Sequence, residues 1–344
     1  MPITVERLPL APQVANLRER RTRRGSFGDR GKRLEIGLVN AMPDGAVAAT
    51  ERQFARLIEE ASGEFDVRLR LFDLETLPRA SEARRAMAED YRAARALKAQ
   101  PQDALIVTGA EPRAPDLRQE LFWSELVFVL DWADAHTISM LLSCLAAHAG
   151  VLHRDGIVRR ALPAKCSGVY SVRVVARHDL VAGFDAEFAT PHSRHNGLDE
   201  AELAAKGYRI LARSPESGVD LFVKEARSLT VFLQGHPEYD ADTLAREYRR
   251  DVLRFLSGEA RAAPRPPTHY FPPPIAAALA DFAGRAASAP SPDLAAAFPS
   301  EALALDEAPW RAAGVRLFRN WLALVARRKA ERNAPSFAVA RWGG

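Results

Sequence analysis

The chain has little cysteine and no long apolar run. Two cysteines among 344 residues are too few for a disulfide framework, so we expect a reducing, cytoplasmic environment. No apolar stretch approaches the ~20 residues that a membrane-spanning helix needs, and the first residues lack the charged and apolar regions of a signal peptide. A hydrophobic content of 47% is typical of a globular chain with a large core. We therefore expect a soluble protein without a membrane partner.

Zinc-finger spacing and an aromatic-rich RNA-binding signature are also missing, although the formal net charge is +4. The basic residues gather near the two ends, within residues 18–33 and 327–332. Such clusters can be solvated arms or nucleic-acid-binding arms, and the missing signatures favour solvated arms. A modest positive field also attracts polyanionic small molecules such as an acyl-CoA. We expect no nucleic-acid partner.

Short apolar runs alternate with helical periodicity along the chain. The predicted strands cover residues 34–39, 67–74, 104–107, 138–142, 169–176, 221–223 and 230–233. The predicted helices cover residues 50–61, 81–99, 121–135 and 310–328. Short buried strands separated by helices are typical of a parallel sheet covered on both faces. We therefore predict an α/β fold, a doubly wound and mostly parallel sheet flanked by helices, with antiparallel pairing among the later strands.

Composition divides the chain into three predicted parts. Residues 1–33 are expected to form an extended basic N-terminal arm, and residues 34–258 an α/β domain. Residues 259–344 become rich in alanine and proline, which indicates an insert and a C-terminal helix packing on the same domain. Within this part we expect residues 259–308 to form an irregular insert with one or two helices.

A cysteine, Cys144, lies where the strand predicted at 138–142 ends and a helix of small residues begins. A lone cysteine is more often a small core residue than a nucleophile. However, a strand-to-helix turn exposes its sulfur, and a helix N-terminus favours the thiolate. The stretch VFLQGHPEYD, residues 231–240, adds a second strand that ends before His236 and Glu238. Because ligands bind beyond the carboxyl ends of parallel strands, these three are a candidate nucleophile, base and orienting carboxylate.

Several motifs in this order are specific. They are LVNAMPD (38–44), VTGAEP (107–112), KCSGVY (165–170), PHSRH (191–195) and GHPEYDADTLAREYRRD (235–251). With them the chain resembles the homoserine O-acyltransferase family of methionine biosynthesis, within the class I glutamine-amidotransferase-like superfamily. The resemblance covers nearly the whole chain and implies a flavodoxin-like catalytic domain at 34–258. It also implies a homodimeric acyltransferase that acts on L-homoserine and an acyl-CoA through a cysteine thioester, with no bound cofactor and no metal.

The resemblance assigns roles to six residues. Cys144 matches the acyl-accepting cysteine, His236 the base and Glu238 its orienting group. The implied substrate-binding residues are Lys165, Ser193 and Arg250. A guanidinium fork suits the carboxylate of homoserine, and the lysine and serine add charge and hydrogen bonds. Without the resemblance, these three would be interpreted as a surface lysine, a loop serine and an exposed helix arginine.

Two departures from the family pattern lie near the sulfur. Leu145 and His148 replace a tryptophan and a glutamine, which indicates a reshaped pocket. His148, four residues after Cys144 on the same helix face, is either a second titrating group near the sulfur or a helix residue facing solvent. The second cysteine, Cys166, is predicted to be structural.

A third departure is Arg113, at the position that chooses the acyl donor in the family. Glycine there accompanies succinyl-CoA and glutamate accompanies acetyl-CoA, so arginine favours a donor with a distal carboxylate unless Glu111 holds it in a surface pair. Three alternative functions stay open: acylation of serine or another small hydroxy amino acid, glutaminase-like amide hydrolysis, and metabolite binding without catalysis. Leu142 and Ala146 flank Cys144 where a glutaminase normally has glycines, which disfavours hydrolysis.

Overall fold

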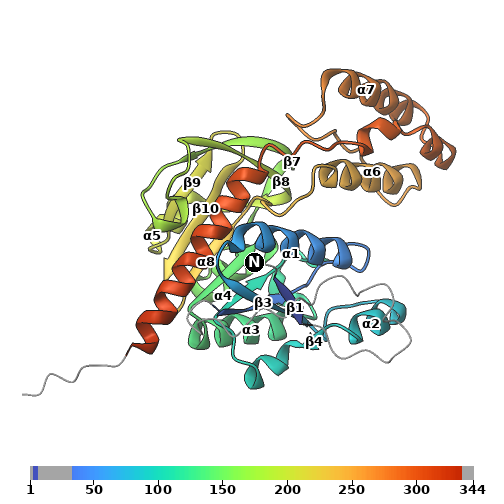
Figure 1. Ribbon diagram of the computed structural model, residues 1–344. Helices are drawn as coiled ribbons and strands as arrows, with labels where there is room; N and C mark the ends of the chain where they lie inside the picture. The colour runs from blue at the N-terminus through green and yellow to red at the C-terminus, as the bar shows by residue number, and fades with distance from the viewer. Residues whose placement is uncertain (1–2, 7–32, 335–344) are drawn as a thin grey trace, which may run out of the picture.

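The computed structural model describes residues 3–6 and 33–334 (Figure 1). The strands are β1 Thr4–Glu6, β2 Arg33–Val39, β3 Asp66–Asp73, β4 Arg92–Ala93, β5 Ala104–Val107, β6 Ser139–Ser143, β7 Arg160–Val174, β8 Glu187–Gly197, β9 Arg209–Ser214, β10 Gly218–Glu225 and β11 Leu229–Leu233. The α-helices are α1 Val47–Ser62, α2 Ser81–Ala88, α3 Trp123–His136, α4 Leu145–Asp155, α5 Glu200–Ala205, α6 Thr243–Leu256, α7 Pro273–Ser288 and α8 Arg311–Asn333.

The described strands form one sheet in the order β1-β3-β2-β5-β6-β11-β10-β9-β7-β8, and β4 pairs with β3. All pairs from β1 to β11 in this order are parallel, whereas β11 to β8 are joined by antiparallel pairs. The order β3-β2-β5-β6-β11 is that of a flavodoxin-like sheet, and the winding direction changes between β2 and β5. The predicted doubly wound, mostly parallel α/β fold is therefore confirmed.

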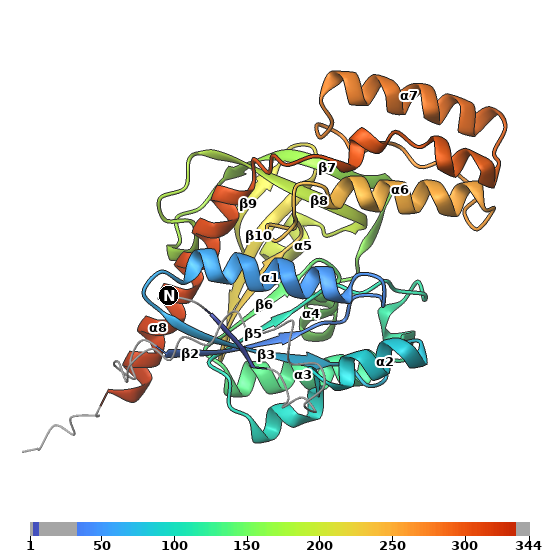
Figure 2. The same cartoon turned by 45° about the vertical axis from the view of Figure 1, so that its right-hand side comes forward.

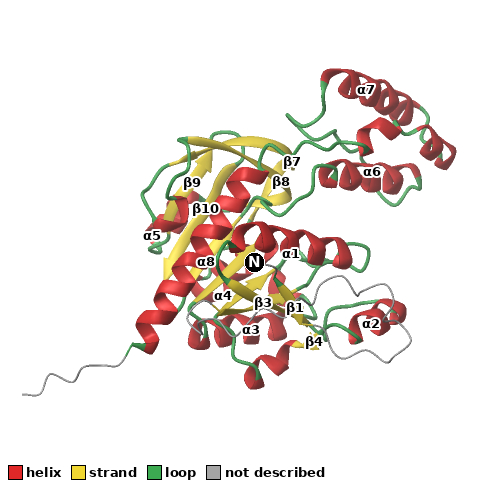
Figure 3. Ribbon diagram, in the orientation of Figure 1, coloured by secondary structure: helices red, strands yellow, loops and turns green. Residues whose placement is uncertain are grey.

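Helices cover both faces of the parallel part (Figure 3). On one face, α1 and α8 pack through residues such as Leu57, Phe318 and Trp321, which are fully buried with the strand side chains. On the other face, α3 and α4 bury Val129 and Ala149 in a second core. The helices predicted over residues 50–61 and 310–328 correspond to α1 and α8. None of the helices between residues 33 and 334 is long and apolar enough to cross a membrane.

A helical arm projects from one end of this body (Figure 2). It consists of α6, α7 and two short 3-10 turns at Pro292–Ala297 and Ser300–Leu303. Side chains from these segments, including Tyr248 and Phe282, form a small core of their own. The chain then returns to the body as α8. The prediction of one or two helices within 259–308 is thus confirmed by α7. The division at residues 33 and 258 stays a prediction, and most of the expected basic arm lies outside the described residues.

Two element predictions need correction. The helix expected over 81–99 ends at Ala88, and β4 and a 3-10 turn at Ala94–Ala99 follow. The cause is a tertiary contact, because Tyr91 is buried and its hydroxyl accepts a hydrogen bond from Asn40 Nδ2 at 3.0 Å. The strand expected at 169–176 is only the last part of β7, which starts at Arg160 and pairs with β8 along most of its length. No strand was predicted at β8, since its polar sequence lacks an apolar run.

Candidate active site

Cys144 occupies a sharp turn between β6 and α4. It is one of two non-glycine residues in the described chain with positive φ, at 51°, a conformation that L-residues adopt at a cost of about 1–3 kcal/mol. Its backbone N–H donates to Leu233 O at 2.7 Å, which ties the turn to the end of β11. Cys144 is only half-buried, so the turn presents the sulfur at the carboxyl edge of the parallel strands. This geometry is that of a nucleophile elbow.

Backbone donors surround this turn. The first N–H groups of α4, on Leu145 and Ala146, have no acceptor within the helix. The loop after β5 lies directly against the elbow, because a Cβ on Gly109 would be 3.6 Å from Cys144 Cβ and from Leu145 N. A negatively charged oxygen formed beside the sulfur would meet amide donors and the positive end of the helix dipole.

His236 and Glu238 lie beside the elbow, after β11. His236 Nδ1 is 2.8 Å from Glu238 Oε1, and both side chains are buried. Nε2 of the same ring has no other partner among the described residues and interacts with the Cys144 sulfur. The turn before His236 needs glycine, since a Cβ on Gly235 would approach Thr190 Cγ2 to 2.1 Å. The structure thus brings the predicted nucleophile, base and carboxylate together.

The electrostatics of this group favour a charged imidazole. Burial alone would lower the pKa of His236, but the Glu238 carboxylate and the Cys144 sulfur outweigh burial and raise the pKa well above its usual value. The ring stacks on Tyr239 with centroids 4.3 Å apart. Burial and the neighbouring carboxylates of Glu247 and Glu238 raise the pKa of Tyr239, which therefore stays neutral. An imidazolium here would stabilise a thiolate on Cys144.

The three predicted substrate-binding residues converge on α6. Lys165 of β7 donates to Asp251 Oδ2 at 2.6 Å, and Arg250 contacts the other oxygen of the same carboxylate at 2.9 Å. Burial opposes ionisation of Asp251, but Lys165 and Arg250 hold its pKa below the usual range. Ser193, on β8 rather than in a loop, donates to Glu247, the carboxylate that also accepts from the Tyr239 hydroxyl at 2.8 Å. Lys165 is largely buried and ion-paired, unlike a typical surface lysine.

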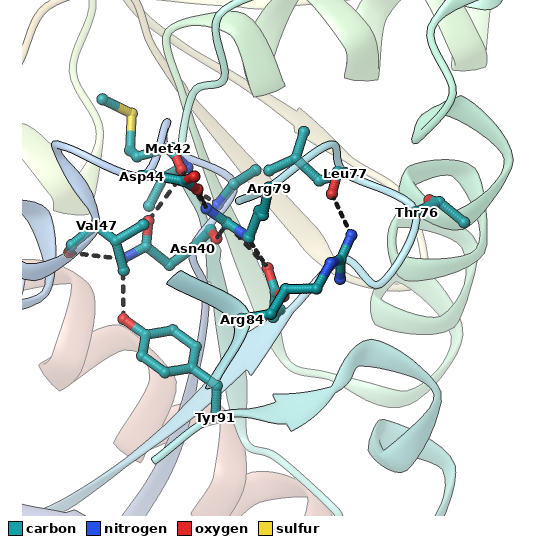
Figure 4. Close-up of polar contacts among 12 residues, drawn as sticks. Asn40, Met42, Asp44, Val47, Thr76, Leu77, Arg79, Arg84 and Tyr91 are labelled. Carbon is teal, nitrogen blue, oxygen red and sulfur yellow. Dashed lines mark hydrogen bonds and ion pairs between the residues drawn. The ribbon is translucent and has the colours of Figure 1, made fainter. Parts of the chain in front are cut away.

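Polar contacts hold the loop after β2 in place (Figure 4). Arg79, whose side chain is fully buried, donates to Asn40 O at 3.0 Å and to Asp73 Oδ1 at 2.9 Å. The backbone N–H of Ala41 donates to Thr108 Oγ1 at 2.8 Å. The loops that follow β2 and β5 are therefore joined at the point where the winding direction changes, which fixes the backbone that faces the elbow.

Arg113 stands apart from these contacts. Its side chain is exposed, and its backbone N–H donates to Glu120 Oε1 at 2.6 Å. Glu111 pairs with Arg254 of α6 at 2.9 Å, so the surface pair considered between Glu111 and Arg113 is absent among the described contacts. Arg113 lies on the loop that borders Cys144, but the structure gives it no partner in the site.

His148 and Leu145 lie behind the elbow. His148 is 2% exposed, so the alternative of a solvent-facing helix residue is wrong. Its Nε2 is 2.7 Å from Gln234 Oε1, and burial lowers its pKa to about 4. Leu145 is 6% exposed and packs in the core beneath α3 and α4. Cys166 is half-buried, and burial raises the pKa of its thiol.

Sequence reasoning missed the acidic residues of the site. Glu247 and Asp251 are four residues apart and therefore face the same side of α6. Their position inside the motif at 235–251 was the available signal, but acidic residues on a helix are usually solvated. Between residues 33 and 334, no group of three or more histidine, cysteine or acidic side chains is arranged to hold a metal ion.

The chain has close similarity to known proteins. The profile of a family described as homoserine O-succinyltransferase matches residues 13–331. A homoserine O-succinyltransferase of Methylorubrum extorquens is 52% identical over 300 residues, which are 87% of this chain and 89% of that protein. One of Rhodopseudomonas palustris is 47% identical, with 85% and 88% covered. Among solved structures, a glutamine amidotransferase from Methylobacillus flagellatus is 14% identical, with a TM-score of 0.48 and coverages of 86% and 94%.

Proposed function

The chain belongs to the homoserine O-succinyltransferase family, and on this premise we propose that it transfers the succinyl group of succinyl-CoA to the hydroxyl of L-homoserine, in methionine biosynthesis. The observation that carries the proposal is the nucleophile elbow at Cys144 with His236 and Glu238 enclosed beside it. A protein that only binds a metabolite has no need of a strained cysteine next to a buried imidazole and carboxylate.

The first half-reaction forms an acyl-enzyme. The Cys144 thiolate attacks the thioester carbonyl, and the backbone N–H groups of the elbow and of the loop at Gly109 stabilise the oxyanion. The carbon–sulfur bond of the donor breaks, and the CoA thiolate leaves with the proton of the His236 imidazolium. The products are a thioester on Cys144, free CoA and a neutral His236.

The second half-reaction transfers the acyl group. Neutral His236 takes the proton of the homoserine hydroxyl as the oxygen attacks the Cys144 thioester. The new carbon–oxygen bond replaces the carbon–sulfur bond, and the sulfur leaves as a thiolate beside the imidazolium. Glu238 stabilises that imidazolium and fixes its orientation through Nδ1. The enzyme returns to its starting charge state.

The contacts on α6 suit a zwitterionic acceptor. The carboxylate of homoserine would pair with the Arg250 fork and with Lys165 in place of Asp251. The ammonium group would take the place of Ser193 as a partner of Glu247. These exchanges give both charges of the acceptor a partner among the groups of α6 and β7.

Succinyl-CoA is the proposed donor because Arg113 supplies positive charge on the loop beside Cys144. The exposure of its side chain makes this contribution small. A homodimeric assembly and a cytoplasmic location complete the proposal, as the family resemblance implies.

Intact-mass spectrometry tests the proposal directly. Without acceptor, succinyl-CoA should add one succinyl group to the protein, and Cys144→Ala should prevent this addition. L-homoserine should then remove the group as O-succinylhomoserine, faster than L-serine does. If no acyl group appears with succinyl-CoA or acetyl-CoA, the acyl-enzyme mechanism is wrong. If ammonia is released from glutamine instead, the protein is an amide hydrolase.

A further inference from the structure

A groove lies between α6 and the 3-10 turn at Pro292–Ala297. Its volume is about 440 Å³, and the insert contributes Pro292 and Ala295 to its lining. The charged side chains in the lining are Arg246, Arg249, Arg250, Arg254 and Glu259. Four guanidinium groups and one carboxylate leave this groove strongly positive, and the mechanism above uses only Arg250.

The arginines share one face of α6. Arg246, Arg250 and Arg254 follow one another at intervals of four residues, and Arg249 lies three residues after Arg246. The eight steps from Arg246 to Arg254 span ~12 Å at 1.5 Å per residue. Arg246 and Arg254 pair with Asp242 at 2.6 Å and Glu111 at 2.9 Å. Arg249 is exposed and has no ion pair within residues 33–334. Exposed ion pairs of this kind are weak and exchange readily for another anion.

One end of the groove lies next to the active site. Arg250 contacts Asp251, the carboxylate that also binds Lys165 of the site. Arg254 binds Glu111, on the loop that follows β5 and borders the elbow. Arg250 and Arg254 therefore lie at the edge of the active site, and Arg246 and Arg249 extend the groove away from it.

We propose that this groove binds the phosphate groups of the acyl-CoA donor, with Arg249 and Arg246 as the main contacts. The inference rests on the proposed function, which supplies a thioester whose leaving group carries a diphosphate and a further phosphate. Guanidinium groups bind phosphate oxygens in a bidentate manner. A pantetheine arm spans roughly 15 Å when extended, from bond lengths of about 1.5 Å, so the phosphates must bind well away from the sulfur.

The groove also gives the helical arm a function. Its apolar lining, from Leu253, Leu256, Pro292 and Ala295, can contact the adenine ring while the arginines contact phosphates. The 3-10 turn packs against α6 and supplies the part of this lining that α6 lacks. In this view, the insert holds the nucleotide end of the donor, and the sheet holds the reacting end.

A truncated donor separates these two ends. We expect Arg249→Glu to raise the KM for succinyl-CoA by roughly tenfold at low ionic strength, with kcat changed less than twofold. The KM for the succinyl thioester of N-acetylcysteamine, which has no phosphate, should stay unchanged, as should the KM for homoserine. Arg285→Glu is the matched control, because it reverses an exposed charge on α7 outside the groove.

A binding measurement completes the test. Calorimetric titration with 3′-phosphoadenosine 5′-phosphate should give binding to the wild type and to Arg285→Glu, and markedly weaker binding to Arg249→Glu. Equal losses with both donors, equal effects of the two substitutions, or no nucleotide binding would each overturn the groove assignment. A change in oligomeric state with unchanged nucleotide binding would make the groove an interface between copies. Wild-type protein that binds the nucleotide but transfers no acyl group would overturn the proposed function and leave the groove assignment standing.

Discussion

The parallel and antiparallel parts of the sheet hold the site in different ways. In the parallel part, Cys144 and His236 follow the buried strands β6 and β11, and backbone hydrogen bonds to Leu233 O and Pro191 O fix them. In the antiparallel part, Lys165 and Ser193 are held by carboxylates of α6. The parallel part thus positions its functional groups through backbone hydrogen bonds, and the antiparallel part positions them through side-chain pairs.

This difference separates two tasks. Backbone anchoring keeps the sulfur and the imidazole in place whether or not a ligand is bound, as catalysis by preorganised groups requires. Ion pairs such as Lys165–Asp251 place charged side chains where the charges of a substrate can also bind. We therefore expect substitutions in the parallel part to lower kcat and those on α6 to raise KM.

The strongest test of this comparison is Cys144→Ser. It should lower kcat at least about a thousandfold, because the buried imidazolium stabilises a thiolate far more than an alkoxide. The unfolding transition should change little, since serine has similar size. Steady-state kinetics and thermal unfolding measure both effects. Cys166→Ser, at the other half-buried cysteine, should keep activity; if it were the inactive variant, the nucleophile would be Cys166.

The next largest effects concern the base and its carboxylate. His236→Asn should cost more than Glu238→Gln, which keeps an oxygen for Nδ1 but loses the charge that stabilises the imidazolium. For Glu238→Gln we expect a loss of several-fold to a few thousandfold in kcat. Glu216→Gln is a matched control, because it removes a carboxylate from an exposed pair with His269. Wild-type kinetics in Glu238→Gln would remove Glu238 from the site.

The same comparison explains which parts of the fold could be predicted. Strands β6 and β11 are fully buried, so they are continuous apolar runs that sequence alone reveals. Strand β8 carries Pro191, His192 and Arg194, and only its pairing with β7 makes it a strand. The prediction of one helix over residues 81–99 was wrong because the burial of Tyr91 overrides the helix propensity of the sequence.

The candidate site divides in the same manner. Cys144, His236 and Glu238 could be predicted because each follows a recognisable strand in a sheet whose ligands bind at one edge. Glu247 and Asp251 could not, since their roles depend on Ser193 and on Lys165, which approach only in three dimensions. The burial of His148 likewise depends on Gln234, 86 residues away.

A smaller effect is expected for Arg113→Glu. The exposed side chain is screened by water and salt, so charge reversal should lower the ratio of kcat/KM for succinyl-CoA to that for acetyl-CoA by about threefold to tenfold. Both constants should be measured at low and at physiological ionic strength. Arg118→Glu, on the same loop but paired with Asp116, is the control. If the ratio of the two kcat/KM values does not change, Arg113 does not determine the acyl donor, and groups nearer the Cys144 sulfur do.

The smallest effect tests whether water is excluded from the region behind Cys144, where His148 is buried. Burial lowers the pKa of His148 to about 4, below the ~6.5 of an unfolded chain. As the pH falls from 7 to 5, the unfolded state therefore takes up a proton that the folded state does not, and folding stability falls with it. The decrease in stability between pH 7 and pH 5 should therefore be smaller by about 2 kcal/mol in His148→Gln than in the wild type. The other histidines are the same in both proteins, so their contributions cancel in this comparison. Urea unfolding at both pH values measures the difference, with His153→Gln on the outer side of α4, where the ring pairs with Asp131, as the control. If wild type and His148→Gln lost stability in parallel, water would reach the ring, and the region behind the elbow would not be sealed.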